Sequence, residues 1–352
     1  MTGFRSSNGY IGLEWQSVQG TSKTPTTFIP ISAEEGIEQV QELLEVRDLT
    51  GDREIGSIHK VQHKPGGSFQ TYARPEIGAE LLTYVLGEEA VSGSAAPYTH
   101  VITRADTIPY ITVERYLDNV ERFVGCKINQ IVITGNTGQP VLLDTTFLAS
   151  DSVIMPSAAT ASYETNEPFF FHDGAYTLDS GAIITIGAFT ITINNNLEQI
   201  FTTSYKPNNL MEGPFDIEVT MRLKFAASDA LYPKVLFGSA TALVDTLADG
   251  DFTVALTYGS STTLRELKFQ IPYMKHLGIT KHLDPATKAV YLDLRSKAYY
   301  STSEIITVTA KNAHGSVYET SASASLSPSQ SASPSVSPSV SPSSSASPSP
   351  SV

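Results

Sequence analysis

Residues 79–87 have the sequence AELLTYVLG, and residues 230–238, 151 positions further along the chain, have the sequence ALYPKVLFG. Two shorter matches occur in the same order on either side of this pair. They are Gly67-Ser68-Phe69 with Gly213-Pro214-Phe215, offset by 146 positions, and Val141-Leu142-Leu143-Asp144 with Val290-Tyr291-Leu292-Asp293, offset by 149. One such match means little, but three collinear matches at a nearly constant offset indicate that one fold occurs twice. A duplicated fold favours a pseudo-symmetric assembly, in which one chain fills two equivalent positions of a ring, over a catalytic pocket.

The composition argues against several classes of protein. The chain has 352 residues with 36 acidic and 23 basic side chains, and its net charge of −13 would repel a nucleic acid backbone. We therefore do not expect a protein that reads a DNA sequence. The single cysteine, Cys126, excludes an intrachain disulfide and a cysteine metal cluster, and we expect it to be a small buried hydrophobic residue.

The sequence predicts no membrane anchor. Met1–Tyr10 is polar, and no stretch of the chain approaches the roughly 18 apolar residues that a membrane span requires. We expect a soluble chain that is made in the cytoplasm.

The C-terminal segment is of low complexity. From Ser321 to Val352 serine occupies every odd-numbered position, six prolines lie between the serines, and there is no charged residue. Such a sequence buries little apolar surface and lacks ladder donors, so it predicts a disordered, extended spacer.

The remaining chain is predicted to be mainly β, with two tandem β-sandwich or open-barrel modules that each carry one short packed helix. The predicted divisions are a first module at 1–155, a linker at 156–168, a second module at 169–316 and the Ser/Pro spacer at 317–352. Strands are predicted at 101–104, 110–115, 128–134, 141–147, 183–193, 216–225, 252–258, 264–271, 290–294 and 305–309.

Two helices are predicted from their end signals. The first begins with Pro75 in its first turn and ends at Gly87. The second follows a cap at Ser228 or Asp229 and ends at Gly238. Ser32 to Glu35 fits a capping box, but the segment through Asp48 fits a strand equally well, so both alternatives stay open there.

Several short motifs carry a resemblance to a known family. They are Phe69–Tyr72, Arg74-Pro75-Glu76, Gly78, Leu81-Leu82 and Leu86-Gly87 in the first half; Ile193–Glu198, Tyr205, Pro207 and Met211-Glu212-Gly213 in the second; and Gly12-Leu13-Glu14, Gln19-Gly20, Phe28-Ile29-Pro30 and Gly125–Asn129. In their order and spacing, over most of residues 10 to 314, they resemble the tail tube (major tail) proteins of tailed bacteriophages, in which two tube modules can be fused in one chain. The Ser/Pro segment lies outside this pattern.

The resemblance implies a non-enzymatic structural virion protein that is made in the cytoplasm of the bacterial host. Its modules would join edge to edge into rings of three chains with pseudo-sixfold symmetry, and the rings would stack into a tube. The implied partners are other copies of the chain, tail tip and terminator proteins, and DNA that passes through the lumen without specific binding. An acidic chain fits a lumen through which DNA must slide.

The sequence predicts no catalytic, cofactor-binding or metal-binding residue. His59 and His63 are four residues apart, but the surrounding glycines and proline favour a loop or hairpin over a metal-binding helix face. His172 and Asp173 follow Phe169-Phe170-Phe171, which we expect to pack between the two modules, and Asp249-Gly250-Asp251 is expected to form a turn rather than a calcium loop. Lys206–Asn209 and the stretch from Gly51 to Gly67 are each either a mobile loop or a contact between rings.

The alternative function is a tandem β-sandwich that binds carbohydrate or a host surface and is displayed on the Ser/Pro stalk. Such a module typically presents aromatic platforms, and Trp15 is the one tryptophan. An enzyme is a third possibility, but no carboxylate or histidine has the spacing of an acid–base pair.

Overall fold

The computed structural model describes residues 9–30, 35–46, 57–182, 186–224, 231–238, 242–284 and 289–318. The Ser/Pro segment from Ser321 to Val352 and the caps at Ser228 and Asp229 lie outside these residues.

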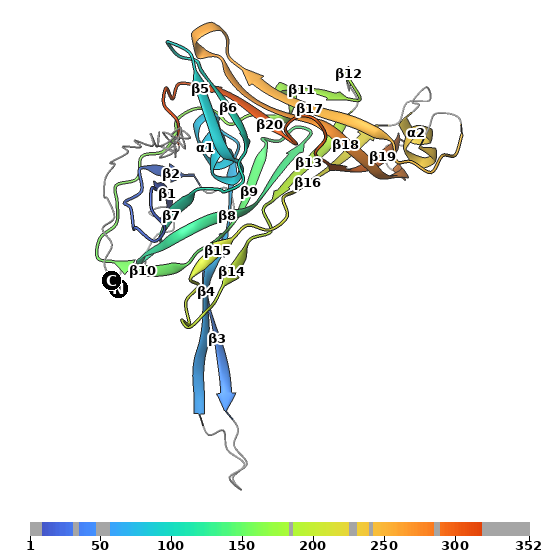
Figure 1. Cartoon of the computed structure of the whole chain (residues 1–352). Helices are drawn as coiled ribbons and strands as arrows, with labels where there is room; N and C mark the ends of the chain where they lie inside the picture. The colour runs from blue at the N-terminus through green and yellow to red at the C-terminus, as the bar shows by residue number, and fades with distance from the viewer. Residues whose placement is uncertain are drawn as a thin grey trace, which may run out of the picture. The chain divides into compact units, whose positions relative to one another are not determined.

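The fold is mainly β, as predicted, and has two α-helices among the described residues (Figure 1). The helices are α1 (Pro75–Leu86) and α2 (Leu231–Phe237). The strands are β1 (Tyr10–Gln16), β2 (Thr27–Ile29), β3 (Glu38–Val46), β4 (Ser57–Tyr72), β5 (Gly87–Ser92), β6 (Tyr98–Arg104), β7 (Tyr110–Tyr116), β8 (Val120–Asn136), β9 (Leu142–Leu148), β10 (Asp151–Met155), β11 (Gly174–Leu178), β12 (Gly181–Ala182), β13 (Ile186–Asn194), β14 (Glu198–Ile200), β15 (Asn209–Met211), β16 (Asp216–Lys224), β17 (Asp249–Tyr258), β18 (Arg265–Asp284), β19 (Ala289–Ala298) and β20 (Thr307–Asn312).

The two halves of the chain share one sheet. Of the described strands, eighteen are connected by hydrogen bonds, and β14 and β15 form a separate hairpin. β8 of the first half pairs with β13 of the second, from Asn136 opposite Ala188 to Gln130 opposite Asn194. β6 pairs with β20 in the same way. Because of these joints, residues Met1–Thr320 form one compact unit, and a division into modules at 1–155 and 169–316 remains a proposal.

The strand pairing of the first half is repeated in the second. In the first half, successive neighbours are β2, β1, β7, β8, β9, β4 and β3. In the second half they are β12, β11, β17, β18, β19, β16 and β13. Every pair is antiparallel, and α1 and α2 follow corresponding strands. The duplication that the sequence matches predicted is therefore present in the topology.

Irregularities in the pairing also recur. In β8, the pairing with β7 shifts register between Phe123 and Cys126. The pairing of β8 with β9 shifts register between Ile128 and Gln130. In β18 the corresponding shifts occur 148 residues later. They lie between Ile271 and Met274 in the pairing with β17, and between His276 and Gly278 in the pairing with β19. A bulge bends a strand and re-aims its side chains. Two bulges at one constant offset therefore give β8 and β18 the same course and fix their residue-by-residue correspondence.

One of the three sequence matches is wrong. Thr71 of β4 lies opposite Leu143, and Leu223 of β16 lies opposite Leu292. The two partners, Leu143 and Leu292, are 149 positions apart, whereas Thr71 and Leu223 are 152 positions apart. The structure thus relates β4 to β16 by 152 positions, not by the 146 that relate Gly67 to Gly213. The reason is local: Gly67 lies inside β4, whereas Gly213 precedes β16.

Helix α1 begins and ends where the sequence predicted. Pro75 occupies the first helical turn, and Gly87 terminates the helix in the left-handed region at φ 97°. All residues of α1 except Glu76 are buried, because the helix packs against β8 and is also covered by β5, β6, β18 and β20. α2 ends at Gly238 with φ 76°, as predicted.

Replacing Gly87 by valine should lower the free energy of unfolding by about 3 kcal/mol, because left-handed backbone strain adds to steric overlap. A Cβ at this position would lie 2.9 Å from the Cβ of Ala105 and 3.1 Å from the carbonyl oxygen of Thr107. Gly138→Val is the matched control, since Gly138 has φ 78° but no atom within 4 Å of such a Cβ. Chemical unfolding should show a clearly larger loss for Gly87→Val, and equal losses would contradict this role of Gly87.

The segment left open between helix and strand is a strand. β3 pairs with β4 from Glu38 opposite Gly66 to Val46 opposite Ser57, and the two form a ribbon that extends away from the rest of this unit (Figure 1). Of the two alternatives for Gly51 to Gly67, the mobile loop is wrong from Ser57 onward, the contact between rings stays a prediction, and residues 51–56 lie outside the described part. Both faces of the outer part of this ribbon, which we call the outer β3–β4 ribbon, meet solvent. Its sequence therefore lacks the apolar alternation that marks a half-buried strand.

Candidate assembly interface

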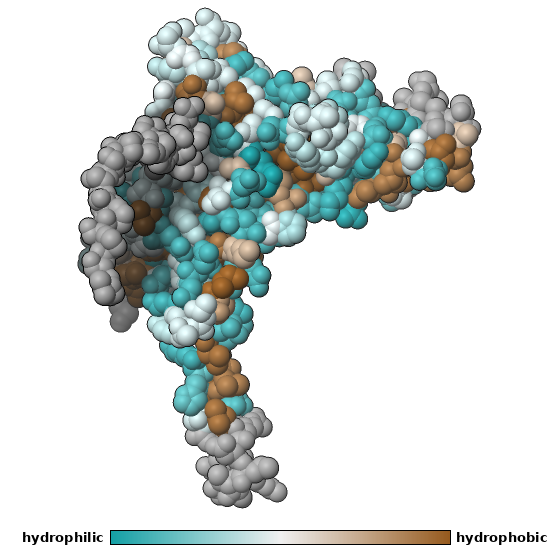
Figure 2. Space-filling view, viewed as in Figure 1, coloured by the Kyte–Doolittle hydropathy of each residue, from teal (hydrophilic) through white to brown (hydrophobic). Residues whose placement is uncertain are grey.

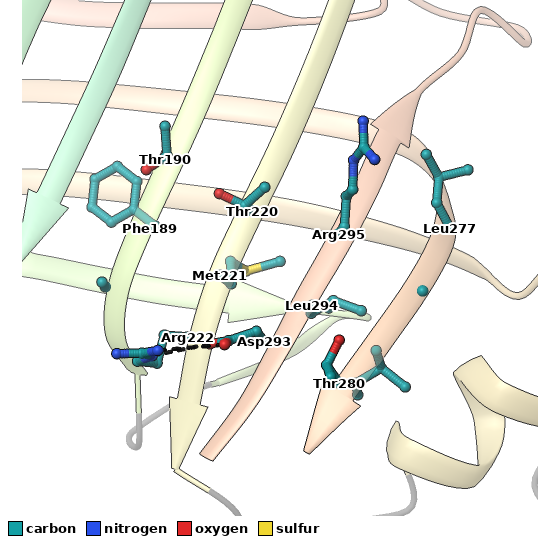
Figure 3. A pocket seen from close by; sticks show the side chains of 13 residues that line it. Phe189, Thr190, Thr220, Met221, Arg222, Leu277, Thr280, Asp293, Leu294 and Arg295 are labelled. Atoms are coloured by element: carbon teal, nitrogen blue, oxygen red, sulfur yellow. Dashed lines mark hydrogen bonds and ion pairs between the residues drawn. The ribbon is translucent and has the colours of Figure 1, made fainter. Parts of the chain in front are cut away.

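Four neighbouring strands of the second half present a polar face to solvent. β13, β16, β19 and β18 lie side by side, and Thr190, Thr220, Arg222, Asp293 and Arg295 extend from the face shown in Figure 3. The alternate residues Phe189, Met221 and Leu294 are buried in the core behind this face. The face encloses an open hollow with a volume of about 580 Å³.

The charged side chains on this face pair across neighbouring strands. Arg222 Nε donates to Asp293 Oδ1 at 3.0 Å, and Arg295 Nη2 donates to Glu218 Oε2 at 3.0 Å. Lys297 Nζ donates to Asp216 Oδ2 at 2.9 Å. Exposed pairs of this kind stabilise a fold little, but they leave a surface on which positive charge is neutralised locally.

The histidines singled out in the sequence do not form a metal centre. His59 Nε2 lies 2.9 Å from Ser57 Oγ, and the buried His63 has its Nε2 3.2 Å from Ser152 Oγ. Burial lowers the pKa of His63. Among the described residues, no group of three or more His, Cys, Asp or Glu side chains could hold a metal ion.

The other candidates have structural partners. His172 is mostly exposed, and its Nε2 lies 3.6 Å from Asp173 Oδ1. Asp249 lies at the start of β17, where Lys275 and Tyr299 donate to its carboxylate, and Asp251 accepts from Ser180 at 3.2 Å. The motif lies inside β17, opposite a bulge in β18, so the expected turn is wrong.

The Phe169–Phe171 segment joins the two halves, as expected. The Phe169 N–H donates to the carbonyl oxygen of Ala73 at 2.9 Å, and its ring lies 5.2 Å from that of Tyr258. Cys126 is fully buried, which raises the pKa of its thiol and agrees with a small hydrophobic role.

The Lys206–Asn209 loop is tied to the body. Lys206 Nζ lies 2.7 Å from Asp151 Oδ1, and Tyr110 Oη donates to Asn209 Oδ1 at 2.9 Å. These contacts argue against a freely mobile loop.

Several described strands pair on one side only, and two of these edges matter for assembly. β18 pairs with β19 from Gly278 to Asp284, but no described strand pairs with its other side there. β3 pairs with β4 only. Open edges present unpaired N–H and C=O groups and are templates for pairing with another chain. The sequence contained no direct sign of either edge.

Apolar side chains are exposed in two further places. Leu43, Leu44 and Ile58 on the β3–β4 ribbon are more than half exposed. The second group surrounds α2 and includes Leu236, Phe237 and Leu243. Figure 2 shows hydrophobic surface along the ribbon and at the α2 end of the molecule. Exposed apolar groups of this size are typical of protein–protein contacts.

A buried carboxyl group lies in α1. Glu80 accepts a hydrogen bond from Tyr84 Oη at 2.8 Å, and burial raises its pKa to about 7. Below pH 4.5 the group is protonated in both the folded and the unfolded chain. Between pH 4.5 and 7 the unfolded chain loses this proton first, so the folded state is destabilised as pH rises, by about 3 kcal/mol in the limit.

Glu80→Gln should remove this dependence. We expect the variant to gain stability relative to the native chain between pH 4 and pH 8, by about 3 kcal/mol, because glutamine keeps an acceptor for Tyr84 but cannot ionise. Urea unfolding across this pH range measures the difference. The exposed Glu88→Gln should give no such trend, and a constant difference for Glu80→Gln would contradict the raised pKa.

The model of a family described as phage tail tube protein matches residues 6–309. No curated protein matches the chain. The match covers most of the sequence, so the chain belongs to the phage tail tube protein family.

Membership of this family gives the chain a structural role in the tail tube of a virion, and it implies self-assembly into a tube together with other tail proteins. In the described part of the chain, neither helix has the length and apolar character needed to cross a membrane.

Proposed function

We propose that the chain is a tail tube subunit with two modules, that three chains close into a pseudo-sixfold ring, and that stacked rings form the channel through which the genome leaves. One observation carries this proposal. The chain already contains one module-to-module joint, in which β8 residues Gln130–Asn136 pair with β13 residues Ala188–Asn194. We call this pairing the internal joint.

The two strand segments that would repeat the internal joint each have a side with which no described strand pairs. The counterpart of Gln130–Asn136, 148 residues later, is the open β18 edge at Gly278–Asp284. The counterpart of β13 is β3, whose outer side is open. A chain with two complementary open edges forms a heterologous contact, and such contacts close into rings when the rotation permits. We call the pairing of β18 with β3 of the next copy the outer joint.

The register of the outer joint follows from the repeat. Glu38 lies opposite Gly66, and Thr192 lies opposite Glu218, which is 152 positions after Gly66. Thr192 is therefore the counterpart of Glu38. Because Thr192 lies opposite Val132 in the internal joint, Glu38 of one copy is expected opposite Thr280 of the next.

The segment just before β3, which extends the same edge, is occupied in the single chain. The Ile37 N–H donates to Glu35 Oε2 at 2.9 Å, and Arg115 Nη1 donates to the Ile37 carbonyl oxygen at 2.7 Å. These side chains hold the backbone groups that would face Lys281 of the next copy. Glu35 and Arg115 must therefore release Ile37 for the outer joint to reach its full length.

The polar face in Figure 3 is the proposed channel lining in the second module. It is the solvent-facing side of the shared sheet, and pairs such as Arg222–Asp293 and Lys297–Asp216 neutralise its positive charges. Phosphate groups would find few unpaired cations there, and the net charge of −13 opposes tight binding of DNA. DNA would therefore pass without specific binding.

The outer β3–β4 ribbon is the proposed contact between stacked rings. Leu43 and Leu44 are 61% and 54% exposed and lie beyond the part of β3 that the outer joint uses. We expect Leu43→Asp combined with Leu44→Asp to leave single rings but to prevent tubes, because carboxylates would replace the apolar contacts between rings. Negative-stain microscopy distinguishes the two products, and tubes of ordinary length from this variant would contradict the role of the ribbon.

Electron microscopy with light scattering on the purified chain at high concentration tests the proposed function. Hollow rings or tubes whose mass increases in steps of three chains are expected. A chain ending at Thr320 should assemble equally, since we propose that the Ser/Pro segment is a spacer. A monomer at every concentration, also with tail tip proteins added as nuclei, would contradict ring assembly.

A further inference from the structure

The two helices occupy corresponding positions but differ in burial. In α1, Val85 and Leu86 before the terminating Gly87 are fully buried. Their counterparts before Gly238, Leu236 and Phe237, are 50% and 40% exposed. In the described part of α2, Val235 alone is buried. Within the described residues, the helix of the second module therefore lacks a cover that the helix of the first module has.

Part of the cover of α1 comes from the second module, through β18 and β20, beside β5 and β6 of its own module. Val308 and Ala310 of β20 are fully buried, and Asn312 Nδ2 donates to the Pro75 carbonyl oxygen at 3.0 Å. β18 contributes as well, since a Cβ built on Gly78 would lie 3.5 Å from Leu267 Cδ2. α1 is thus enclosed between its own module and the one that follows it.

The counterpart of β20 in the first module is β10. β20 pairs with the first part of β18, with Val308 opposite Phe269, and β10 pairs with the first part of β8, with Ile154 opposite Glu121. Glu121 and Phe269 are 148 positions apart, the offset that relates β8 to β18. Ile154 is therefore the counterpart of Val308, yet it is 68% exposed where Val308 is fully buried.

We infer that β10 of one copy covers α2 of the preceding copy, with Ile154 packed against Leu236 and Phe237. The occupant is a second copy of this chain, because the chain itself already shows this contact once, between β20 and α1. The copy that supplies β10 is also the copy that supplies β3 to the outer joint, so both contacts belong to one interface. This inference rests on the proposed ring.

The decisive variant is Ile154→Asp. Ile154 is largely exposed, so the single chain should keep its melting temperature, whereas a carboxylate set against Leu236 and Phe237 would be buried without a partner. We expect the protein concentration at half-assembly to rise by about tenfold or more. The double variant Ile154→Asp with Leu236→Lys should recover part of the loss through a new ion pair. Val18→Asp, at a position that is 62% exposed, is the matched control and should assemble like the native chain.

The possible results separate the two levels of the proposal. Rings from the native chain and equally stable rings from Ile154→Asp would overturn the β10–α2 contact alone. A native chain that never forms rings would overturn ring assembly and this contact together. Weakened assembly of Ile154→Asp with partial recovery in the double variant supports the contact.

Discussion

Ile279→Pro should abolish ring formation while the single chain stays folded. In the internal joint, the Asn195 N–H donates to the Asn129 carbonyl oxygen at 2.8 Å. Alternate residues of an antiparallel strand direct their backbone groups to the same neighbour, so Ile131 also faces β13. Ile279 is the counterpart of Ile131 and therefore directs its N–H to the open side of β18. Proline is tolerated where a strand N–H faces solvent, but it removes the donor and blocks pairing with a further strand.

Ile279→Ala is the matched control for this variant. It removes the same apolar side chain but keeps the N–H, so we expect it to form rings. Light scattering measures assembly, and a thermal melt establishes that both variants are folded. Rings of native mass from a folded Ile279→Pro chain would show that this edge of β18 is not used.

Glu114→Ala should produce the largest loss of stability. The Glu114 side chain is fully buried, accepts from Tyr10 Oη at 2.6 Å and pairs with Arg122, whose Nε lies 2.6 Å away. Arg122 is itself 7% exposed, so removal of the carboxylate leaves a buried guanidinium without its partner. Breaking a buried pair in this way typically costs about 3–5 kcal/mol.

Asp106→Ala provides the comparison at an exposed pair. Arg104 Nη2 lies 3.0 Å from Asp106 Oδ1, and the Asp106 side chain is almost fully exposed. Its loss should change the free energy of unfolding by less than about 1 kcal/mol. Urea unfolding of both variants measures the contrast. A Glu114→Ala chain within 1 kcal/mol of the native one would contradict the role of Glu114 in joining β1, β7 and β8.

The helices and most strands could be predicted because their signals are local. Pro75 and Gly87 mark both ends of α1, and the alternation in Asp216–Lys224 marks a strand with one solvated face. The outer β3–β4 ribbon could not be predicted because neither of its faces contacts the core, so Leu43 and Leu44 lie exposed on adjacent positions of one strand.

The candidate interface depends on relations between distant strands that the sequence does not display. In the bulges against β9 and β19, the extra residue is Asn129 in β8 and Leu277 in β18, and these residue types give no common signal. The similarity of Gly67 to Gly213 also misled, because it suggested a register that the strands do not have. The repeat could be detected in the sequence, but its open edges became visible only in the pairing of the strands.

A designed disulfide tests the outer joint most directly. A chain with Glu38→Cys and Thr280→Cys carries one cysteine on each open edge, and its native Cys126 is fully buried. Val132→Cys with Thr192→Cys is the positive control, because these residues lie opposite each other in the internal joint and should form a bond within one chain. After mild oxidation of assembled protein, we predict a covalent closed species with the mass of three chains for Glu38→Cys with Thr280→Cys. Assembled protein that stays uncrosslinked, while the control pair oxidises, would contradict the outer joint.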